Sequence, residues 1–265
     1  QAPGPRNDRP DGRRGHGDPR HTTPARSLYG EPPMTTAPTP ATEAPKGVDV
    51  ARVTAWFQAH APEVTPPLSF ELIAGGRSNL TYRVTDAAGH AWVLRRPPLG
   101  QGLPTAHDMG REHRIISALA ATDVPVAPVV GLCEDEAVNG APFYVMAFVD
   151  GLVARDAAAA QALDVDARAR AGDQIPDVLA RIHAVDPDAV GLGDLGRREG
   201  YVERQLKRWY GQWQKSKTRD LPVVDEVHDA LSARVPEQGP AAIVHGDYRL
   251  DNCLLAPDGT IAAVL

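Results

Sequence analysis

Apolar positions along the chain change their spacing near residue 150, and this change predicts two structural regions. The segment 50–61 places its apolar residues three and four positions apart, which indicates a short amphipathic helix. After it, runs rich in β-branched and aromatic residues predict five strands, LSFELIAGG, NLTYRVTD, HAWVLRR, VVGLCE and FYVMAFVDG. A second helix, HDMGREHRIISALAAT, falls between the third and fourth strands. The first region is therefore expected to be a small lobe with an antiparallel sheet.

Beyond this lobe the apolar positions follow a helical period. Three segments fit it, DARARAGDQIPDVLARIHAV, REGYVERQLKRWYGQWQKS and VDEVHDALSARV, and Pro176 is expected to interrupt the first. His183 is interpreted as a packed or capping residue, and the aromatic stripe of Trp209, Tyr210 and Trp213 as packing in the core or between lobes. The final run, CLLA-PDG-TIAAVL, predicts a hairpin that follows a loop.

This order of elements predicts an α+β, bilobal, protein-kinase-like fold. The N-terminal, nucleotide-binding lobe is placed at residues 47–150, with a five-stranded antiparallel sheet and a helix. The helical C-terminal lobe, with a catalytic-type loop where the lobes meet, is placed at 151–265. Residues 1–46 hold 10 of the 25 prolines and few periodic apolar residues, so a disordered tail is predicted. Met34 in this tail is a candidate natural start, which would make residues 1–33 upstream sequence.

Composition narrows the classes of function. With 265 residues, 42% of them hydrophobic, the chain can bury a substantial core. The formal charge is −6, and the only basic cluster lies in the tail, which argues against nucleic-acid binding by the folded part. No run of 18 apolar residues indicates a membrane span. Cys133 and Cys253 lie far apart without a CxxC motif, so neither a disulfide nor a zinc site is predicted, and the cytoplasm is favoured.

The stretch HGDYRLDN carries the clearest chemistry. Its spacing matches the kinase catalytic loop H-R-D-x-x-x-x-N, with Gly246 in place of Arg. One loop would then supply His245 and Asp247, with Asp247 as the base that accepts a hydroxyl proton, and Asn252 as an oxygen ligand of a metal ion. The alternative is a surface loop in which Asp247 caps a turn and Asn252 begins a strand.

Together with VLRRPP and FYVMAFVDG, this loop makes residues 68–265 resemble the aminoglycoside phosphotransferase-type kinase family. The three runs are most similar to phosphotransferase-like kinases that are fused to, or encoded beside, acyl-CoA dehydrogenases. The resemblance implies an ATP-dependent kinase that uses Mg²⁺ and phosphorylates a small-molecule hydroxyl acceptor, such as an aminoglycoside, a choline-like alcohol, homoserine, a sugar or a hydroxylated acyl metabolite. It also implies a functional link to an acyl-CoA dehydrogenase. The alternative from another class is a non-catalytic nucleotide-binding pseudokinase or interaction module.

A second motif, GGRSNLTYRV, joins the first two predicted strands. Gly75 and Gly76 permit a close backbone approach, and Gly76, Arg77, Ser78 and Asn79 would offer N–H groups to phosphates. A Gly-Gly hairpin turn is the simpler alternative.

Arg95 and Glu112 are expected to form an ion pair in the nucleotide-binding lobe. By resemblance, Arg95 takes the place of the lysine that kinases direct at the α- and β-phosphates. Glu112 lies on the apolar stripe of its helix, so its carboxylate is expected to face the sheet and to need a cation. Open alternatives are Arg96 as the partner, a strand end with solvated basic residues, and a Glu112 that points to water.

The last strand of the sheet resembles the hinge between the lobes of kinases. The resemblance implies that Met146 borders the adenine pocket and that backbone groups of Ala147, Phe148 and Val149 bond the base. A buried strand is an alternative that is compatible with this role.

In the resembling family, the strand after the hairpin is followed at once by a metal-binding Asp. This chain ends at Leu265, where that Asp would come next, and it does not begin with Met. The expectation is therefore a fragment of a longer reading frame with a truncated C-terminal lobe. Weak or absent phosphoryl transfer is expected of this chain, because Asn252 alone is an incomplete Mg²⁺ site.

Overall fold

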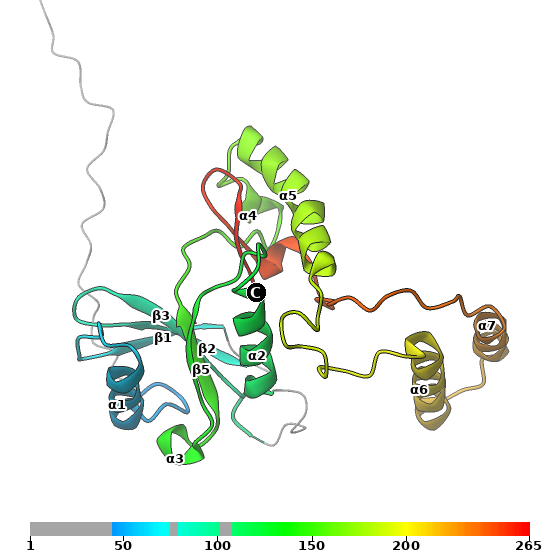
Figure 1. Ribbon diagram of the computed structural model, residues 1–265, viewed down its shortest axis with the longest axis horizontal. Helices are drawn as coiled ribbons and strands as arrows, with labels where there is room; N and C mark the ends of the chain where they lie inside the picture. Colours follow the sequence, from blue (N-terminus) through cyan, green and yellow to red (C-terminus); the bar gives the residue numbers. More distant parts are fainter. Residues whose placement is uncertain (1–43, 75–78, 101–107) are drawn as a thin grey trace, which may run out of the picture. The chain divides into compact units, whose positions relative to one another are not determined.

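Five strands form one antiparallel sheet in the order β1-β2-β3-β5-β4 (Figure 1). The computed structural model describes residues 44–74, 79–100 and 108–265. The strands are β1 (Ser69–Ala74), β2 (Leu80–Thr85), β3 (Ala91–Arg96), β4 (Val129–Cys133) and β5 (Phe143–Ala147). Leu94 at the centre of β3 lies opposite Tyr82 on one side and Val145 on the other. The five strands predicted from the sequence are confirmed.

Helix α1 (Val50–His60) covers one face of this sheet. Its buried Trp56 and Phe57 lie in one apolar cluster with Leu94 of β3. Asp49 begins the helix, because its side chain accepts a hydrogen bond from a backbone N–H of the first turn. The alternation of side chains along β3 leaves the other face for a second helix.

Helix α2 (Met109–Leu119) packs on that other face. It contacts β4 and β5, and its buried Met109 lies in a cluster with Val93 and Met146. Arg95 follows Val93 by two positions, so both side chains leave β3 on the side of α2. The predicted ion pair of the lobe therefore belongs to the space between the sheet and α2.

Beyond the sheet the chain is mainly helical. The helices are α3 (Glu136–Asn139), a single turn between β4 and β5, then α4 (Ala157–Ala160), α5 (Val165–Ala184), α6 (Tyr201–Ser216) and α7 (Pro222–Ser232). The chain then forms the 3-10 turn η1 (Leu250–Asn252) and the hairpin β6 (Cys253–Leu255) and β7 (Ile261–Val264), as predicted. None of the helices in the described part of the chain combines the length and apolar character needed to cross a bilayer. The lobe boundaries proposed at residues 47, 150 and 265 stay predictions.

Helix α5 continues through Pro176 without a break. A proline inside a helix removes one hydrogen bond and costs about 3 kcal/mol or more. Ala171 on one side of it, and Val178 and Ile182 on the other, are buried in an apolar cluster with Ile261 of the hairpin. The predicted interruption is wrong, because burial on both sides of the proline offsets its cost.

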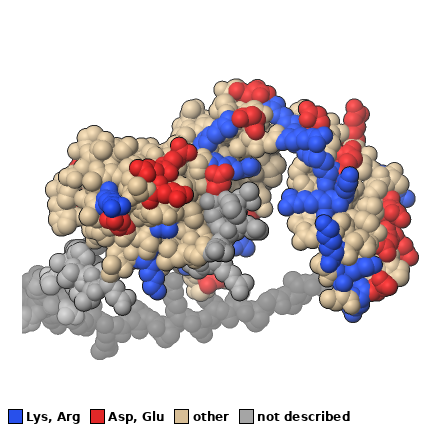
Figure 2. Space-filling view, turned by 90° about the horizontal axis from the view of Figure 1, so that it is seen from below, with Lys and Arg blue, Asp and Glu red and all other residues tan. Residues whose placement is uncertain are grey.

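Helices α6 and α7 pack on each other while much of their apolar surface stays accessible. Tyr210 stacks on His228 with ring centroids 3.9 Å apart and donates to Asp225 over 2.7 Å. Trp209 is 57% exposed, and none of the described residues of α6 is buried. The interpretation of this aromatic stripe as core packing is wrong, because its contacts among the described residues are mainly with α7, and packing between lobes stays a prediction. Figure 2 shows Lys and Arg gathered along α6.

His183 near the end of α5, which was predicted to pack or to cap, is exposed.

The C-terminal hairpin pairs with the segment that follows the sheet. Leu152 and Leu255 form an isolated antiparallel bridge, with reciprocal N–H···O distances of 2.8 and 2.9 Å. Gly151 permits this approach, since a Cβ atom there would lie 2.9 Å from Cβ of Leu254. The bridge therefore holds the hairpin next to the segment that leaves β5.

Candidate functional site

His245 is held at the start of the predicted catalytic loop by two hydrogen bonds. Its Nδ1 accepts from the N–H of Asp247 over 3.2 Å, and its Nε2 lies 3.0 Å from the carbonyl oxygen of Leu265. Because Nδ1 accepts, Nε2 carries the proton and donates to that carbonyl. Gly246 between them has a φ of 88°, which a residue with a Cβ atom rarely adopts. His245 therefore orients the loop through both of its ring nitrogens.

Asp247 and Asn252 converge, as their spacing in the sequence requires of a catalytic pair. The Asn252 side chain donates through Nδ2 to the carbonyl oxygen of Asp247 over 2.7 Å and to its Oδ2 over 3.0 Å. This use of Nδ2 turns the amide oxygen of Asn252 away from Asp247. The Asp247 side chain is 68% exposed, so the loop presents its carboxylate to solvent.

Arg249 completes the charge pattern of this loop. Its Nε lies 2.8 Å from Oδ1 of Asp251 and 3.6 Å from Oδ1 of Asp247. The shorter contact fixes the guanidinium on Asp251, while the exposed contact with Asp247 contributes little. Oδ1 of Asp247 therefore stays the oxygen with the weaker engagement among the described residues.

Three side chains offer donors to Glu112 of α2, two from the sheet and one from the residue directly before β2. Arg95 Nη2 lies 3.4 Å from its Oε2, the Tyr144 hydroxyl donates to Oε2 over 3.2 Å, and Asn79 Nδ2 donates to Oε1 over 2.8 Å. Burial raises the pKa of the Tyr144 hydroxyl well above its usual value, so Tyr144 stays a neutral donor. The predicted pairing of Arg95 with Glu112 is present, and the interpretation in which Glu112 points to water is wrong.

Arg96 leaves β3 on the opposite face from Arg95. It is buried and donates to the carbonyl oxygens of Gly47 and Asn139. It therefore anchors the chain before α1 and is not the partner of Glu112. The alternation of side chains along the strand places the two arginines on opposite faces of the sheet. Arg96 packs on the face away from α2, and Arg95 lies on the face that α2 covers.

Arg95 has one buried N–H donor that Glu112 does not use. Its Nε is shielded from solvent and has no hydrogen-bond partner among the described residues. A buried N–H without an acceptor costs free energy comparable to that of a lost hydrogen bond. An oxygen-rich anion such as a phosphate group fits this donor, since guanidinium groups bind phosphates through several N–H groups.

The predicted hinge is a buried strand end with part of its backbone already in use. Met146 is buried beside Val93. The N–H of Ala147 donates to Pro128 over 2.8 Å, and the N–H of Phe148 donates to Ala91 over 3.3 Å. A base at this hinge would therefore meet carbonyl oxygens or later backbone groups rather than these two donors. The predicted contacts of Ala147, Phe148 and Val149 with a base stay predictions.

The glycine-rich motif is described only at its end. Gly75, Gly76, Arg77 and Ser78 lie outside the described residues. Asn79 is buried, and its side chain donates to Glu112. The prediction that its backbone N–H meets a phosphate is untested.

The donor set at the loop fits a metal ion carried by phosphates rather than a site made by protein alone. Within the described ranges, no three His, Cys, Asp or Glu side chains are grouped to hold a metal. Mg²⁺ bound with a nucleotide takes only one or two protein ligands beside phosphate oxygens and water. The amide oxygen of Asn252 is suited to be one of them.

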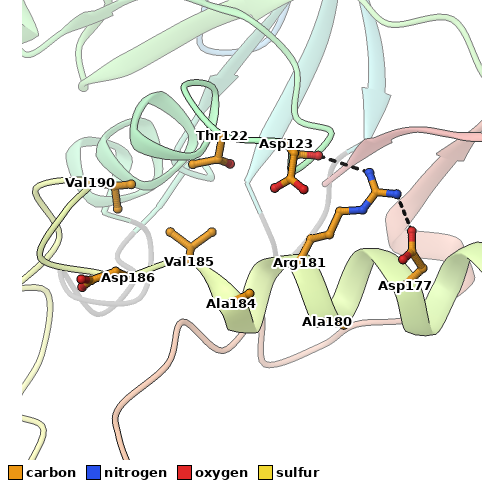
Figure 3. Close-up of a pocket in the computed structure, with 9 residues that line it drawn as sticks. All are labelled: Thr122, Asp123, Asp177, Ala180, Arg181, Ala184, Val185, Asp186 and Val190. Atoms are coloured by element: carbon orange, nitrogen blue, oxygen red, sulfur yellow. Dashed lines mark hydrogen bonds and ion pairs between the residues drawn. The ribbon is translucent and has the colours of Figure 1, made fainter.

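A separate cavity of about 510 Å³ lies at the C-terminal end of α5 (Figure 3). Arg181 lies along its wall and donates to the carbonyl oxygen of Asp123 and to the carboxylate of Asp177. None of the predicted site residues lines this cavity. It is therefore not the place where the predicted chemistry gathers.

Two side chains shape the site in ways that the sequence did not predict. Tyr144 alternates with buried Phe143 and Val145, so its position on the Met146 side of β5 was available from the strand period. Asn79 was considered only for its backbone. Nothing in the order of residues indicates that its amide reaches Glu112, because that contact depends on how α2 packs on the sheet.

Comparisons with known proteins agree with this arrangement. A family model described as "Phosphotransferase enzyme family" matches residues 69–265. Acyl-CoA dehydrogenase family member 10 of Mus musculus is 36% identical over 202 residues, which are 76% of this chain and 19% of that protein. The chain therefore spans about a fifth of the length of this curated relative.

Solved structures are similar over most of the chain. A Ralstonia eutropha protein assigned as an aminoglycoside phosphotransferase is 38% identical, with a TM-score of 0.69, over 82% of this chain and 64% of that one. The complex of APH(2″)-IIIa with GDP and kanamycin has a TM-score of 0.54 at 16% identity, over 80% of this chain and 70% of that one. The second comparison concerns the fold alone.

Proposed function

The chain belongs to the phosphotransferase enzyme family, and we propose that it is a kinase that transfers the γ-phosphoryl group of ATP to a hydroxyl group of a small molecule. Its fold is the protein-kinase-like fold of that family, as predicted from the order of its elements. The observation that carries the proposal is the convergence of Asp247 and Asn252 on one exposed loop, 3.0 Å apart.

Asp247 acts as the base in this proposal. Its Oδ1 accepts the proton of the acceptor hydroxyl. The hydroxyl oxygen then bonds to the γ-phosphorus as the bond between this phosphorus and the nucleoside diphosphate breaks. Asn252 holds Oδ2 through its amide N–H and so fixes the orientation of the carboxylate. The amide oxygen of Asn252 is proposed as a ligand of Mg²⁺, which when bound neutralises part of the phosphate charge.

Arg95 binds the phosphates in this proposal, and Glu112 positions it. The unpartnered Nε supports this role, because it gives the guanidinium a donor that Glu112 does not use. Tyr144 and Asn79 hold the carboxylate of Glu112 in turn. The ion pair thus has its orientation before any nucleotide arrives, which reduces the ordering cost of binding.

The acceptor is proposed to be a hydroxylated acyl metabolite. The support is the similarity to an acyl-CoA dehydrogenase family member, which also suggests a functional link to an acyl-CoA dehydrogenase. Similarity to the Ralstonia eutropha protein assigned as an aminoglycoside phosphotransferase keeps aminoglycosides in the set of compounds to test, and GTP is tested beside ATP. Both cysteines are buried and unpaired, which is in keeping with the proposed cytoplasmic location.

The test combines nucleotide binding with turnover. Purified protein is titrated with ATP and GTP in the presence of Mg²⁺, and ADP release is followed across a panel of hydroxyl acceptors. We expect ATP binding, and a transfer rate that Asp247→Asn lowers by roughly 10²- to 10⁴-fold at unchanged ATP affinity. The exposed Asp220→Asn, 86% accessible, serves as the control and should leave both quantities unchanged.

Two outcomes separate the candidate functions. ATP binding without turnover on any acceptor supports the non-catalytic nucleotide-binding alternative over the kinase. Absence of ATP and GTP binding would refute both the kinase and the nucleotide-binding module.

A further inference from the structure

A second arginine lies on the same face of the sheet as Arg95. In the register of β2, β3 and β5, Arg83 lies opposite Val93, and Val93 lies opposite Met146. The neighbouring row is Thr81, Arg95 and Tyr144. Side chains two residues apart on a strand share a face, so Arg83 stands beside Arg95 on the side covered by α2.

The guanidinium of Arg83 lies over the ring of Phe148, with Cζ 4.5 Å from the ring centroid. Phe148 directly follows β5 and donates its N–H to Ala91, at the end of β3 that is remote from Arg95. Arg83 therefore points toward the hinge end of this face, while Arg95 serves the end where β1 and β2 join.

Arg83 also has an unused buried donor. Its Nε is shielded from solvent and has no hydrogen-bond partner among the described residues. None of the acidic side chains in the described ranges forms an ion pair with it. A guanidinium stacks on flat rings as well as donating hydrogen bonds. A flat aromatic ligand beside Phe148 would therefore stabilise the charge of Arg83.

We propose that Arg83 recognises the purine ring of the bound nucleotide by stacking its guanidinium on the face of the base. The inference rests on the proposed function, since it assigns a residue to the base within the same nucleotide site. Arg83 and Arg95 lie in rows of the sheet that are two residues apart, roughly 6.6 Å along the strands, so the two arginines serve different parts of one nucleotide. Arg95 binds phosphates, and Arg83 binds the base beside the hinge.

The experiment measures the affinity of the purified protein for three ligands, ATP, adenosine and inorganic tripolyphosphate. Arg83→Met keeps an unbranched apolar side chain and removes the guanidinium. We expect this variant to bind ATP and adenosine about three- to tenfold more weakly and tripolyphosphate as well as the unaltered protein does. Arg95→Met should show the reverse, with tripolyphosphate weakened and adenosine unchanged.

A second variant separates stacking from charge. Arg83→Lys retains the positive charge without the planar group, so adenosine binding should stay weakened. Loss of tripolyphosphate binding in Arg83→Met with adenosine unaffected would overturn the proposal in favour of a phosphate contact. Equal loss of adenosine and tripolyphosphate would also overturn it, because a structural role would then explain the effect. If the unaltered protein bound none of the three ligands, the proposed function would fail, and this inference with it.

Discussion

The side-chain amide of Asn252 donates to both the carbonyl oxygen and the carboxylate of Asp247, at 2.7 and 3.0 Å. One residue thus fixes the orientation of the proposed base, and its amide oxygen is the proposed metal ligand. The two roles that kinases give to residues five apart are coupled here by a direct contact.

Replacement of Asn252 should change the dependence on Mg²⁺. Asn252→Ala removes the proposed ligand and frees the Asp247 carboxylate, so we expect transfer or metal affinity to fall by roughly 10- to 100-fold. Asn252→Asp keeps an oxygen ligand and should retain more of the metal response. A Mg²⁺ titration of ATP affinity and ADP release measures this, and an Asn252→Ala variant with an unaltered Mg²⁺ requirement would contradict the assignment.

Replacement of Glu112 should weaken nucleotide binding without unfolding the sheet. Glu112→Gln removes the charge that holds Arg95, while the Tyr144 and Asn79 side chains can still bond the new amide. Because the pair is partly exposed, we expect a loss of about fivefold in ATP affinity, or ~1 kcal/mol. Isothermal titration calorimetry measures the affinity, with the exposed Glu63→Gln as control. Equal affinities in all three proteins would show that the pair plays no part in binding.

Two tryptophans should differ sharply in their contribution to stability. Trp56 is 8% exposed and packs edge-on against Phe143, with ring centroids 5.1 Å apart. Trp56→Ala should therefore lower the free energy of unfolding by about 3–5 kcal/mol. Trp209→Ala, the same change at a 57% exposed position, should cost less than about 1 kcal/mol. Urea unfolding followed by circular dichroism compares them, and similar costs would contradict the burial described above.

Asp86 should make stability depend on pH in the acid range. Burial of its carboxylate raises the pKa, but hydrogen bonds from Thr65 and His90 lower it by more than burial raises it. The net pKa is lowered from 3.8 to about 2. A carboxyl whose pKa is lower in the folded than in the unfolded protein stabilises the fold at pH values above its unfolded pKa. That stabilisation is lost as the pH falls from about 4 to about 2.

The comparison for this prediction is Asp86→Asn. The midpoint of thermal unfolding of the unaltered protein should fall more steeply than that of the variant between pH 4 and pH 2. The stability gap between the two proteins should therefore narrow in this range. A gap that stayed constant would mean that Asp86 does not titrate with this shift.

Local periodicity predicted the sheet, and together with the resemblance to kinases it predicted the Arg95–Glu112 pair. The period of two on β3 and the helical period of α2 each direct one side chain to the space between them, and opposite charges then select each other. The spacing of Asp247 and Asn252 likewise predicted a convergence that the structure contains.

Tertiary packing decided what periodicity could not. Pro176 was expected to break α5, but buried neighbours on both sides keep the helix continuous. The stripe around Trp209 has the spacing of a core helix, yet the described residues cover it with little besides α7. Asn79 reaches Glu112 only because α2 crosses the sheet at that row. Each of these depends on which elements meet, and a single element does not contain that information.

The backbone bridge between Leu152 and Leu255 has a dynamic consequence. Segments far apart in the sequence share a pair of reciprocal hydrogen bonds, so the amide protons of both residues are released by the same local opening. Hydrogen exchange at the two positions should therefore show one common protection factor. The hairpin of β6 and β7 and the segment that follows β5 would then open and close as a single cooperative unit.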